Sequence, residues 1–237
     1  MKGTIDVCLS PDMMHLYPVE DKTVVIVDIL RATSCMTTAL AHSIDSITPF
    51  AQLPECLALK ESGYVTAGER DGKKVEGFDL GNSPFEYMNP SLKGRKIAFT
   101  TTNGTRAIAK AAGAKEIVIG SFLNLSATVS YLRNSNSNIL IVCSGWKGKV
   151  NLEDTVFAGA IVENLKGDFD HACDAPMMAQ RLYVAARHDL KEFLKDSTHI
   201  KRLKRLNIEK DIDFCLTEDQ YDIVPVIRDN RIIVVKP

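Results

Sequence analysis

The sequence of 237 residues lacks any apolar run long enough to span a bilayer, which argues against a helical membrane protein. Its first stretch, MKGTIDVCLSPDMM, lacks the apolar core of a signal peptide. The six cysteines form no CxxC pair and no zinc-binding spacing. We therefore expect a cytoplasmic protein without a membrane partner, whose thiols are mostly buried and reduced.

An excess of charge of one sign is also lacking, since 29 Lys and Arg residues face 30 Asp and Glu residues, for a net charge of −1. A nearly neutral chain gives no global argument for binding nucleic acid or an anionic membrane. The basic run KRLKRL is short and is typical of a solvated helix face. Any anion must therefore be bound by local clusters of arginine.

Strand-like and helix-like runs alternate along the chain. Strand-like patterns occupy residues 4–9, 23–27, 46–50, 64–67, 97–100, 116–120 and 139–143. Helix-like patterns occupy residues 32–42, 53–61, 104–112, 125–132, 152–165 and 175–206. The glycine-rich residues 68–84 form a long loop or a hairpin, and the final run IVPVIRDNRIIVV predicts a β-hairpin turning at Asp229-Asn230. We predict one α/β domain over residues 1–237, with a mixed, largely parallel sheet covered by helices on both faces.

Ligands in such sheets bind beyond the carboxyl ends of the strands, so the residues that follow each strand are informative. After the strand KIAF comes TTTNGTR, with hydroxyls on Thr101 and Thr102 and a tight Asn103-Gly104 turn into a helix. Free N–H groups at the helix start, together with Arg106, suit a phosphate. A capped turn with a surface arginine explains this stretch equally well.

The strand TVVIVD places Asp28 at its end, and Arg31, Thr33 and Ser34 open the helix that follows. An acid that closes so apolar a strand needs a partner or a metal ion. A capped helix with a solvated Asp–Arg pair is the weaker alternative. This junction therefore repeats the pattern of hydroxyls and arginine and adds a carboxylate.

In the glycine-rich segment, Glu69 and Arg70 follow a strand, and Asn82 and Ser83 come shortly before a Pro that starts a helix. Charged, glycine-rich stretches are more often flexible, solvated loops. Long loops inside compact domains are nevertheless often functional, so this segment is our third candidate.

The strand ILIVC ends at Ser144, and Glu153 and Asp154 lie in the first turn of the next helix. The helix dipole alone favours acids there. Across the four junctions, however, arginines and hydroxyls accompany carboxylates, which suits a phosphate held beside Mg²⁺. The candidate metal ligands are Asp28, Glu69, Glu153 and Asp154.

The segments VDILRATS, GERDGKKVEGFDLGNSPFE, TTNGTRA and CSGWKGKVNLEDTVFAG resemble, in this order, the 2-phosphosulfolactate phosphatase family, and the resemblance covers nearly the whole chain. It implies a three-layer α/β/α fold and a Mg²⁺-dependent phosphoric monoester hydrolase of coenzyme M biosynthesis, which converts (2R)-2-phospho-3-sulfolactate to 3-sulfolactate and phosphate. The family most often has Ser-Thr where this chain has Ser34-Cys35, which argues against Cys35 as an obligatory nucleophile.

Such a substrate carries a phosphate, a sulfonate and a carboxylate, so its site needs several cations. We predict Arg31 and Arg106 at the phosphate, and Arg70 at the sulfonate or carboxylate. The candidate catalytic residues are Asp28, Arg31, Arg106 and Asp154. The candidate substrate-binding residues are Arg31, Ser34, Arg70, Asn82, Ser83, Thr101, Thr102, Asn103, Gly104, Arg106 and Ser144.

Several alternatives stay open at this point. Water could attack directly, or Asp28 could be a phosphorylated nucleophile. The protein could instead hydrolyse another small phospho-acid, act as a Mg²⁺-dependent isomerase or transferase, or bind an anion without turnover. His199, in a basic helical run, is more often a surface or interface residue than a site residue, and Trp146 is either a lid or a dimer contact. A homodimer rests on base rates alone.

Overall fold

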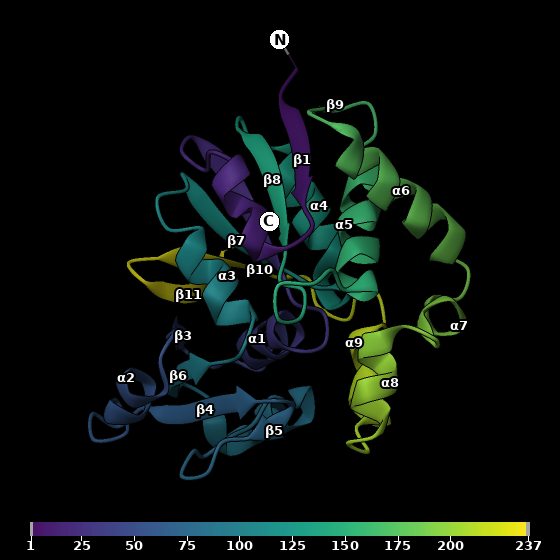
Figure 1. Cartoon of the computed structure of the whole chain (residues 1–237). Helices are drawn as coiled ribbons and strands as arrows, with labels where there is room; N and C mark the ends of the chain where they lie inside the picture. The colour runs from purple at the N-terminus through teal and green to yellow at the C-terminus, as the bar shows by residue number, and fades with distance from the viewer. Residues whose placement is uncertain (1, 236–237) are drawn as a thin grey trace.

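The buried apolar runs form an 11-stranded sheet in the computed structural model, which describes residues 2–235 (Figure 1). The predicted domain of residues 1–237 also includes residue 1 and residues 236–237, which lie outside the described residues. In sheet order the strands are β5 (Lys73–Lys74), β4 (Val65–Arg70), β6 (Lys96–Thr100), β3 (Ser46–Pro49), β11 (Arg231–Val235), β10 (Val224–Arg228), β7 (Glu116–Gly120), β2 (Lys22–Val27), β8 (Asn138–Cys143), β1 (Thr4–Cys8) and β9 (Asp170–His171).

The sheet consists of two parallel blocks separated by a hairpin. Strands β7, β2, β8, β1 and β9 form one block, and β4, β6 and β3 form the other. The hairpin β10–β11 pairs antiparallel with both blocks, and it turns at Asp229 and Asn230, whose φ angles are 49° and 58°. Both the mixed, largely parallel sheet and the C-terminal hairpin were predicted and are confirmed.

The hairpin is only loosely paired with each block, through Val226–Val118 on one side and Ile232–Ile47 on the other. Strand β4 accordingly lies crosswise to β8 and β1 (Figure 1). This turn of the sheet lets the segment after β6 contact the segment after β2, since Gly104 packs against Asp28. The junctions that carry the candidate residues therefore meet, although the two blocks run in opposite directions.

Side chains of β2 show why helices cover both faces. Val24 and Ile26 are buried in one cluster with α1 (Ala32–Ala41) and α3 (Gly104–Lys110), while Val25 and Val27 are buried in another with α4 (Leu125–Arg133), α5 (Leu152–Asn164) and α6 (Asp174–Ala186). Alternate residues of a strand point to opposite faces, so a wholly apolar strand requires a helical layer on each side. Each such side chain contributes about 1.5–3 kcal/mol on burial.

The region predicted as helical over residues 175–206 is divided into α6, α7 (Leu190–Leu194) and α8 (Thr198–Lys204), and we did not predict α9 (Glu209–Cys215). Side chains of Asp189 and Ser197 cap α7 and α8 by accepting bonds from Glu192 N (3.0 Å) and Ile200 N (3.2 Å). The remaining short elements are η1 (Pro11–Leu16), α2 (Leu53–Ala58), η2 (Pro84–Met88), η3 (Pro90–Leu92) and η4 (Phe122–Asn124).

Two expectations about the whole chain concern membranes and thiols. Between residues 2 and 235, no helix combines the length and apolarity that crossing a membrane requires. All six cysteines are free, and five of them are buried; Cys173 is the exposed one. Burial raises the pKa of the Cys35 thiol well above its usual value.

Candidate active site

Four carboxylates from three junctions lie together in the interior. Asp28 follows β2, Glu69 ends β4, and Glu153 and Asp154 occupy the first turn of α5; each is at most 8% exposed. Burial raises the pKa of Asp28 to about 6; nearby His199 opposes this, whereas the charges of Glu69 and Glu153 raise the pKa further. Burial, then Glu153 and Asp28, raise the pKa of Asp154 well above its usual range. The structure therefore brings the four predicted carboxylates together.

The oxygens of Asp154 are already occupied by backbone groups. Oδ1 accepts a hydrogen bond from Ile29 N (2.9 Å), and Oδ2 accepts one from Gly145 N (3.0 Å). These bonds join the segments that follow β2 and β8. Asp154 thus holds two strand ends in place, and its free acceptor capacity is smaller than that of its neighbour Glu153.

Glu153 has a buried carboxylate oxygen without a partner in the described part of the chain. Its side chain is fully buried, Oε1 accepts a bond from His199 Nδ1, and Oε2 has no hydrogen-bond partner among the described residues. Asp28 Oδ1 is 3.4 Å from Ala32 N, and Asp28 Oδ2 faces Gly104. A buried carboxylate oxygen without a partner is costly, so Glu153 Oε2 calls for a donor or a cation.

The threonines of the TTTNGTR stretch bond each other and the neighbouring strand β4. Thr101 and Thr105 bond each other, with Thr105 Oγ1 donating to Thr101 O at 2.9 Å. Thr102 donates from N and Oγ1 to Glu69 Oε2, each at 3.3 Å. Asn103 makes no capping bond from its side chain. In this structure the hydroxyl of Thr102 therefore positions Glu69, a role that we did not predict for it.

Arg31 is buried and lies at the wall of a cavity of about 580 Å³. Its Nη1 forms an ion pair with Asp211 on α9, and its Nη2 donates to Gly72 O at 3.2 Å. Ser83 Oγ donates to the other oxygen of Asp211 at 2.9 Å, and the buried Asn82 Oδ1, which also lines the cavity, has no partner among the described residues. Three predicted substrate-binding residues thus share one cavity.

Two predicted arginines lie elsewhere. Arg70 follows Glu69 in β4, so its side chain points to the opposite face, where it donates to Thr100 Oγ1 at 3.0 Å. Arg106 is half-exposed and pairs with Asp12 on η1. The structure therefore does not place either guanidinium against the four carboxylates, because a nearer local partner holds each one.

The two predicted serines are both buried. Ser34 donates to Ile29 O at 2.9 Å, which ties the first turn of α1 back to the end of β2. Ser144 Oγ has no partner among the described residues. Ser144 therefore has a hydroxyl available for a ligand, next to Gly145, whose N–H donates to Asp154. The hydroxyl of Ser34 is already used in a bond to the backbone.

The interpretation of His199 as a surface residue was wrong. His199 on α8 is 7% exposed, and Arg202 Nη2 lies 2.9 Å from its Nε2. A guanidinium can only donate, so Nε2 accepts, and the ring proton lies on Nδ1 and is donated to Glu153 Oε1. We predicted no role for Arg202 or Asp211, and the sequence gives no local signal for either, because both reach the site from short helices between β9 and β10 and not from the end of a strand.

Trp146 completes this arrangement. Its ring stacks on His199, with centroids 5.9 Å apart, and the guanidinium carbon of Arg202 lies 3.7 Å from the ring centroid. The ring belongs to a turn in which Trp146 and Lys149 exchange two backbone hydrogen bonds of 2.9 Å. The ring thus packs on two residues beside the carboxylates, and both predicted roles, lid and dimer contact, stay predictions.

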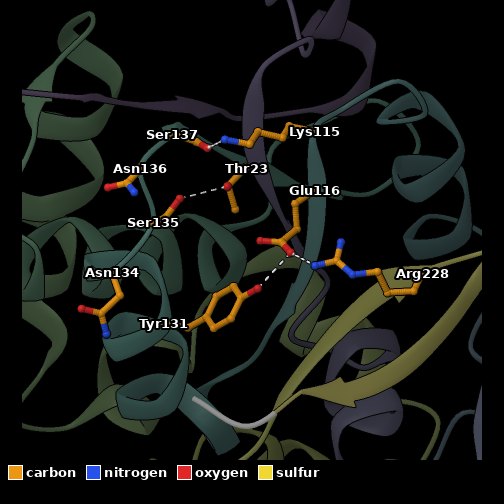
Figure 2. Close-up of a pocket in the computed structure, with 9 residues that line it drawn as sticks. All are labelled: Thr23, Lys115, Glu116, Tyr131, Asn134, Ser135, Asn136, Ser137 and Arg228. Carbon is orange, nitrogen blue, oxygen red and sulfur yellow. Dashed lines mark hydrogen bonds and ion pairs between the residues drawn. The ribbon is translucent and has the colours of Figure 1, made fainter.

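A second cavity, of about 460 Å³, lies at the amino ends of β2, β7 and β8 (Figure 2). Its charged groups satisfy one another: Glu116 accepts bonds from Tyr131 (2.9 Å) and Arg228, and Lys115 donates to Ser137 (2.8 Å). This network joins strand ends and helix α4. The unsatisfied buried carboxylate lies instead at the carboxyl ends, where ligands of α/β sheets bind.

The donor set of the carboxylate cluster suits Mg²⁺ in its chemistry. No three carboxylate, imidazole or thiol side chains among residues 2–235 form a ready-made cage for a metal. Mg²⁺, however, commonly uses one or two carboxylates and takes its other ligands from water and substrate. The unpaired Glu153 Oε2 and the neighbouring Asp28 supply two hard oxygen donors of that kind.

Comparisons with known proteins agree with the resemblance seen in the sequence. The family model described as 2-phosphosulpholactate phosphatase matches residues 8–230. The chain belongs to the 2-phosphosulfolactate phosphatase family. A protein of Thermotoga maritima named "Probable 2-phosphosulfolactate phosphatase" is 43% identical over 94% of this chain and 95% of its own length. A protein of the same name from Pseudothermotoga lettingae is 40% identical over 98% of this chain and 100% of its own.

Membership of the 2-phosphosulfolactate phosphatase family confirms the predicted enzyme class, a phosphoric monoester hydrolase. The match includes every junction at which we predicted site residues, from Asp28 to Asp154. The roles of the individual residues stay predictions.

Proposed function

We propose that this protein is a Mg²⁺-dependent phosphatase that hydrolyses (2R)-2-phospho-3-sulfolactate to 3-sulfolactate and phosphate, the reaction used in coenzyme M biosynthesis. The observation that carries the proposal is Glu153, which is fully buried and has an oxygen without a partner. It lies beside Asp28, whose pKa burial raises to about 6. Membership of the family supplies the reaction class.

The charge balance of the site supports a cation as cofactor. The four buried carboxylates outnumber the two neighbouring guanidinium groups, Arg31 and Arg202, and Arg31 is already paired with Asp211. A substrate with three acid groups would be repelled from such a site unless a cation joined it. When bound, Mg²⁺ supplies charge neutralisation at the phosphoryl oxygens and lowers the pKa of a water ligand.

Hydrolysis adds water across the bond between phosphorus and the ester oxygen. A water oxygen bonds to phosphorus, the ester bond breaks, and the leaving oxygen of sulfolactate takes up a proton. A carboxylate of the cluster that does not bind the metal is suited to take the proton from water or to give one to the leaving oxygen. Arg31 lies in the wall of the adjoining cavity and is suited to bind the phosphate.

The test is phosphate release from racemic 2-phospho-3-sulfolactate, with Mg²⁺ and then with excess EDTA, beside a panel of simple phospho-acids. We expect release only with the metal, fastest on the sulfonate, and lost in Asp28→Asn and Glu153→Gln. Glu163→Gln on the same helix is the matched control, because Glu163 bonds Gln180 away from the carboxylates (2.6 Å). Release from other phospho-acids alone would keep the phosphatase and reject this substrate.

The alternatives give different results in the same assay. A Mg²⁺-dependent isomerase or transferase would consume a phospho-acid without free phosphate appearing. A protein that only binds an anion would show binding that does not depend on Mg²⁺ and no turnover. We rank the latter last, because it gives no use to four buried carboxylates.

A further inference from the structure

We infer that Arg202 is the binding site for a second acid group of the substrate, a carboxylate or a sulfonate, beside the place of the phosphate. The inference rests on the proposed function and deepens it, because it names what distinguishes the substrate from a simple phosphate ester. It is carried by three observations: the bonding of the guanidinium, the way it is held, and the charges around it.

The guanidinium of Arg202 is partly buried and has no carboxylate partner among the described residues. Nη2 donates to His199 Nε2 at 2.9 Å, Nη1 lies 3.4 Å from Asp71 O, and the buried Nε has no hydrogen-bond partner there. Leaving a buried charged donor without an acceptor is costly. An anion from solution would complete its bonding.

Other arginines of the chain differ in this respect. Arg31 is paired with Asp211, and Arg106 with Asp12. Arg70 also lacks a carboxylate partner, but it follows Glu69 in β4 and so faces the opposite side of the sheet. Of these four arginines, Arg202 is the one whose free bonding capacity lies on the side of the carboxylates.

The guanidinium is held flat by the ring of Trp146, 3.7 Å from the ring centroid. The ring is presented by a tight turn in which Lys147 and Gly148 both have positive φ angles, 48° and 79°. Lys147 Nζ lies 3.3 Å from Asp71 Oδ1, so the turn is also tied to the hairpin β4–β5. A guanidinium stacked in this way keeps its N–H edges oriented and loses little freedom on binding.

The charges around Arg202 place it at the site rather than on the periphery. Burial lowers the pKa of Arg202, while the charges of Glu69 and Glu153 raise it and that of Arg31 lowers it. Arg202 therefore lies within electrostatic reach of two site carboxylates and of the predicted phosphate ligand. A guanidinium fork matches the oxygens of a carboxylate or a sulfonate, and this position leaves the phosphate to Arg31.

The test compares substrates that differ by one acid group: 2-phospho-3-sulfolactate, 2-phospholactate and isopropyl phosphate. We expect Arg202→Gln to raise KM for 2-phospho-3-sulfolactate by about 10- to 100-fold, as for loss of a charged hydrogen bond, and to affect isopropyl phosphate much less. Arg202→Lys should recover part of the loss. Arg205→Gln, an exposed arginine of the same segment, is the matched control and should change nothing.

The rise in KM on 2-phospholactate, compared with that on 2-phospho-3-sulfolactate, identifies the acid group that Arg202 binds. A loss confined to 2-phospho-3-sulfolactate assigns Arg202 to the sulfonate, and an equal loss on 2-phospholactate assigns it to the carboxylate. A fall in kcat of the same size on all three substrates would overturn the inference, because it would show that Arg202 acts only by positioning His199 and Glu153. Unchanged KM values would overturn it as well.

Binding of 3-sulfolactate, measured by calorimetry with Mg²⁺, separates this inference from the proposed function. If the wild-type protein hydrolyses 2-phospho-3-sulfolactate but Arg202→Gln binds 3-sulfolactate as tightly, the function stands and the inference fails. If the wild-type protein releases no phosphate yet binds 3-sulfolactate at least 10-fold more tightly than the variant, the function fails and the inference stands.

Discussion

Gly104 is the residue through which the Asn-Gly pair of the TTTNGTR stretch contacts the site. A Cβ at this position would lie 2.8 Å from Ala32 Cβ and 2.9 Å from Asp28 Oδ2. Ordinary contacts are about 3.5 Å, so Gly104→Ala forces the Asp28 carboxylate or helix α3 to move by roughly 0.6 Å. The glycine is therefore required by the close approach of two segments that follow different strands.

The magnitude of the change can be estimated for stability and for activity. Overpacking costs about 1–3 kcal/mol, while replacing Gly by Ala in a helix returns up to about 1 kcal/mol. We expect a loss of about 1–2 kcal/mol in the free energy of unfolding, or a fall in Tm of roughly 2–8 °C. Turnover should fall more steeply, by about 10- to 100-fold, because small misplacements of a catalytic group are costly.

Phosphate release and thermal unfolding of Gly104→Ala, measured side by side, check this reasoning. Ala109→Gly, on the exposed side of the same helix, is the control: it should cost about 0.5–1 kcal/mol and leave turnover unchanged. If Gly104→Ala kept full activity, Asp28 would not be at the reacting centre. If both variants lost activity in proportion to stability, the contact between Gly104 and Asp28 would have no catalytic meaning.

Three further predictions concern charged groups. Burial raises the pKa of Asp28 to about 6, above its unfolded value, so in EDTA Asp28 should add up to roughly 3 kcal/mol to the free energy of unfolding as pH falls from about 7.5 to 4. Asp28→Asn should remove this part of the rise in chemical denaturation and leave the part that Asp154 contributes. Asp211→Asn leaves the buried guanidinium of Arg31 without its carboxylate and should lower the free energy of unfolding by about 3–5 kcal/mol in the same assay. Asp213→Asn, on the same helix as Asp211, removes an exposed ion pair with Lys191 and should lower it by less than about 1 kcal/mol. Arg106 can bind phosphate only if it releases Asp12, so Arg106→Ala should raise KM and Asp12→Asn should lower it. Unchanged KM values in both variants would mean that TTTNGTR is only a capped turn with a surface arginine.

Much of the fold follows from local pattern. Apolar runs such as residues 23–27 and 139–143 predict strands because both faces of each must be buried. The turn at Asp229 and Asn230 was predictable because these residue types tolerate positive φ. The short helix α9 was not, since seven residues with acids in the first turn give little periodic signal.

The candidate site divides in the same way. Asp28, Glu69, Glu153 and Asp154 were found from sequence because the end of a strand is a local property. The turn of the sheet then brings the end of β4 to the ends of β2 and β8, although the two blocks run in opposite directions. The hydrogen-bonding role of each carboxylate was not predictable. Asp154 binds two backbone N–H groups, whereas its neighbour Glu153 keeps an oxygen free, and only the surrounding loops distinguish the two.

The sequence by itself determined the layered α/β architecture and the candidate carboxylates, because periodicity and strand ends are properties of neighbouring residues, and its four motifs carried the resemblance to the family. Only the tertiary structure decided which cationic side chain pairs with which acidic side chain. Arg106 binds Asp12, Arg31 binds Asp211, and Arg202 lies against Trp146 without a carboxylate partner among the described residues. The partner of a charged side chain depends on which segments pack against it, and these segments are far apart along the chain.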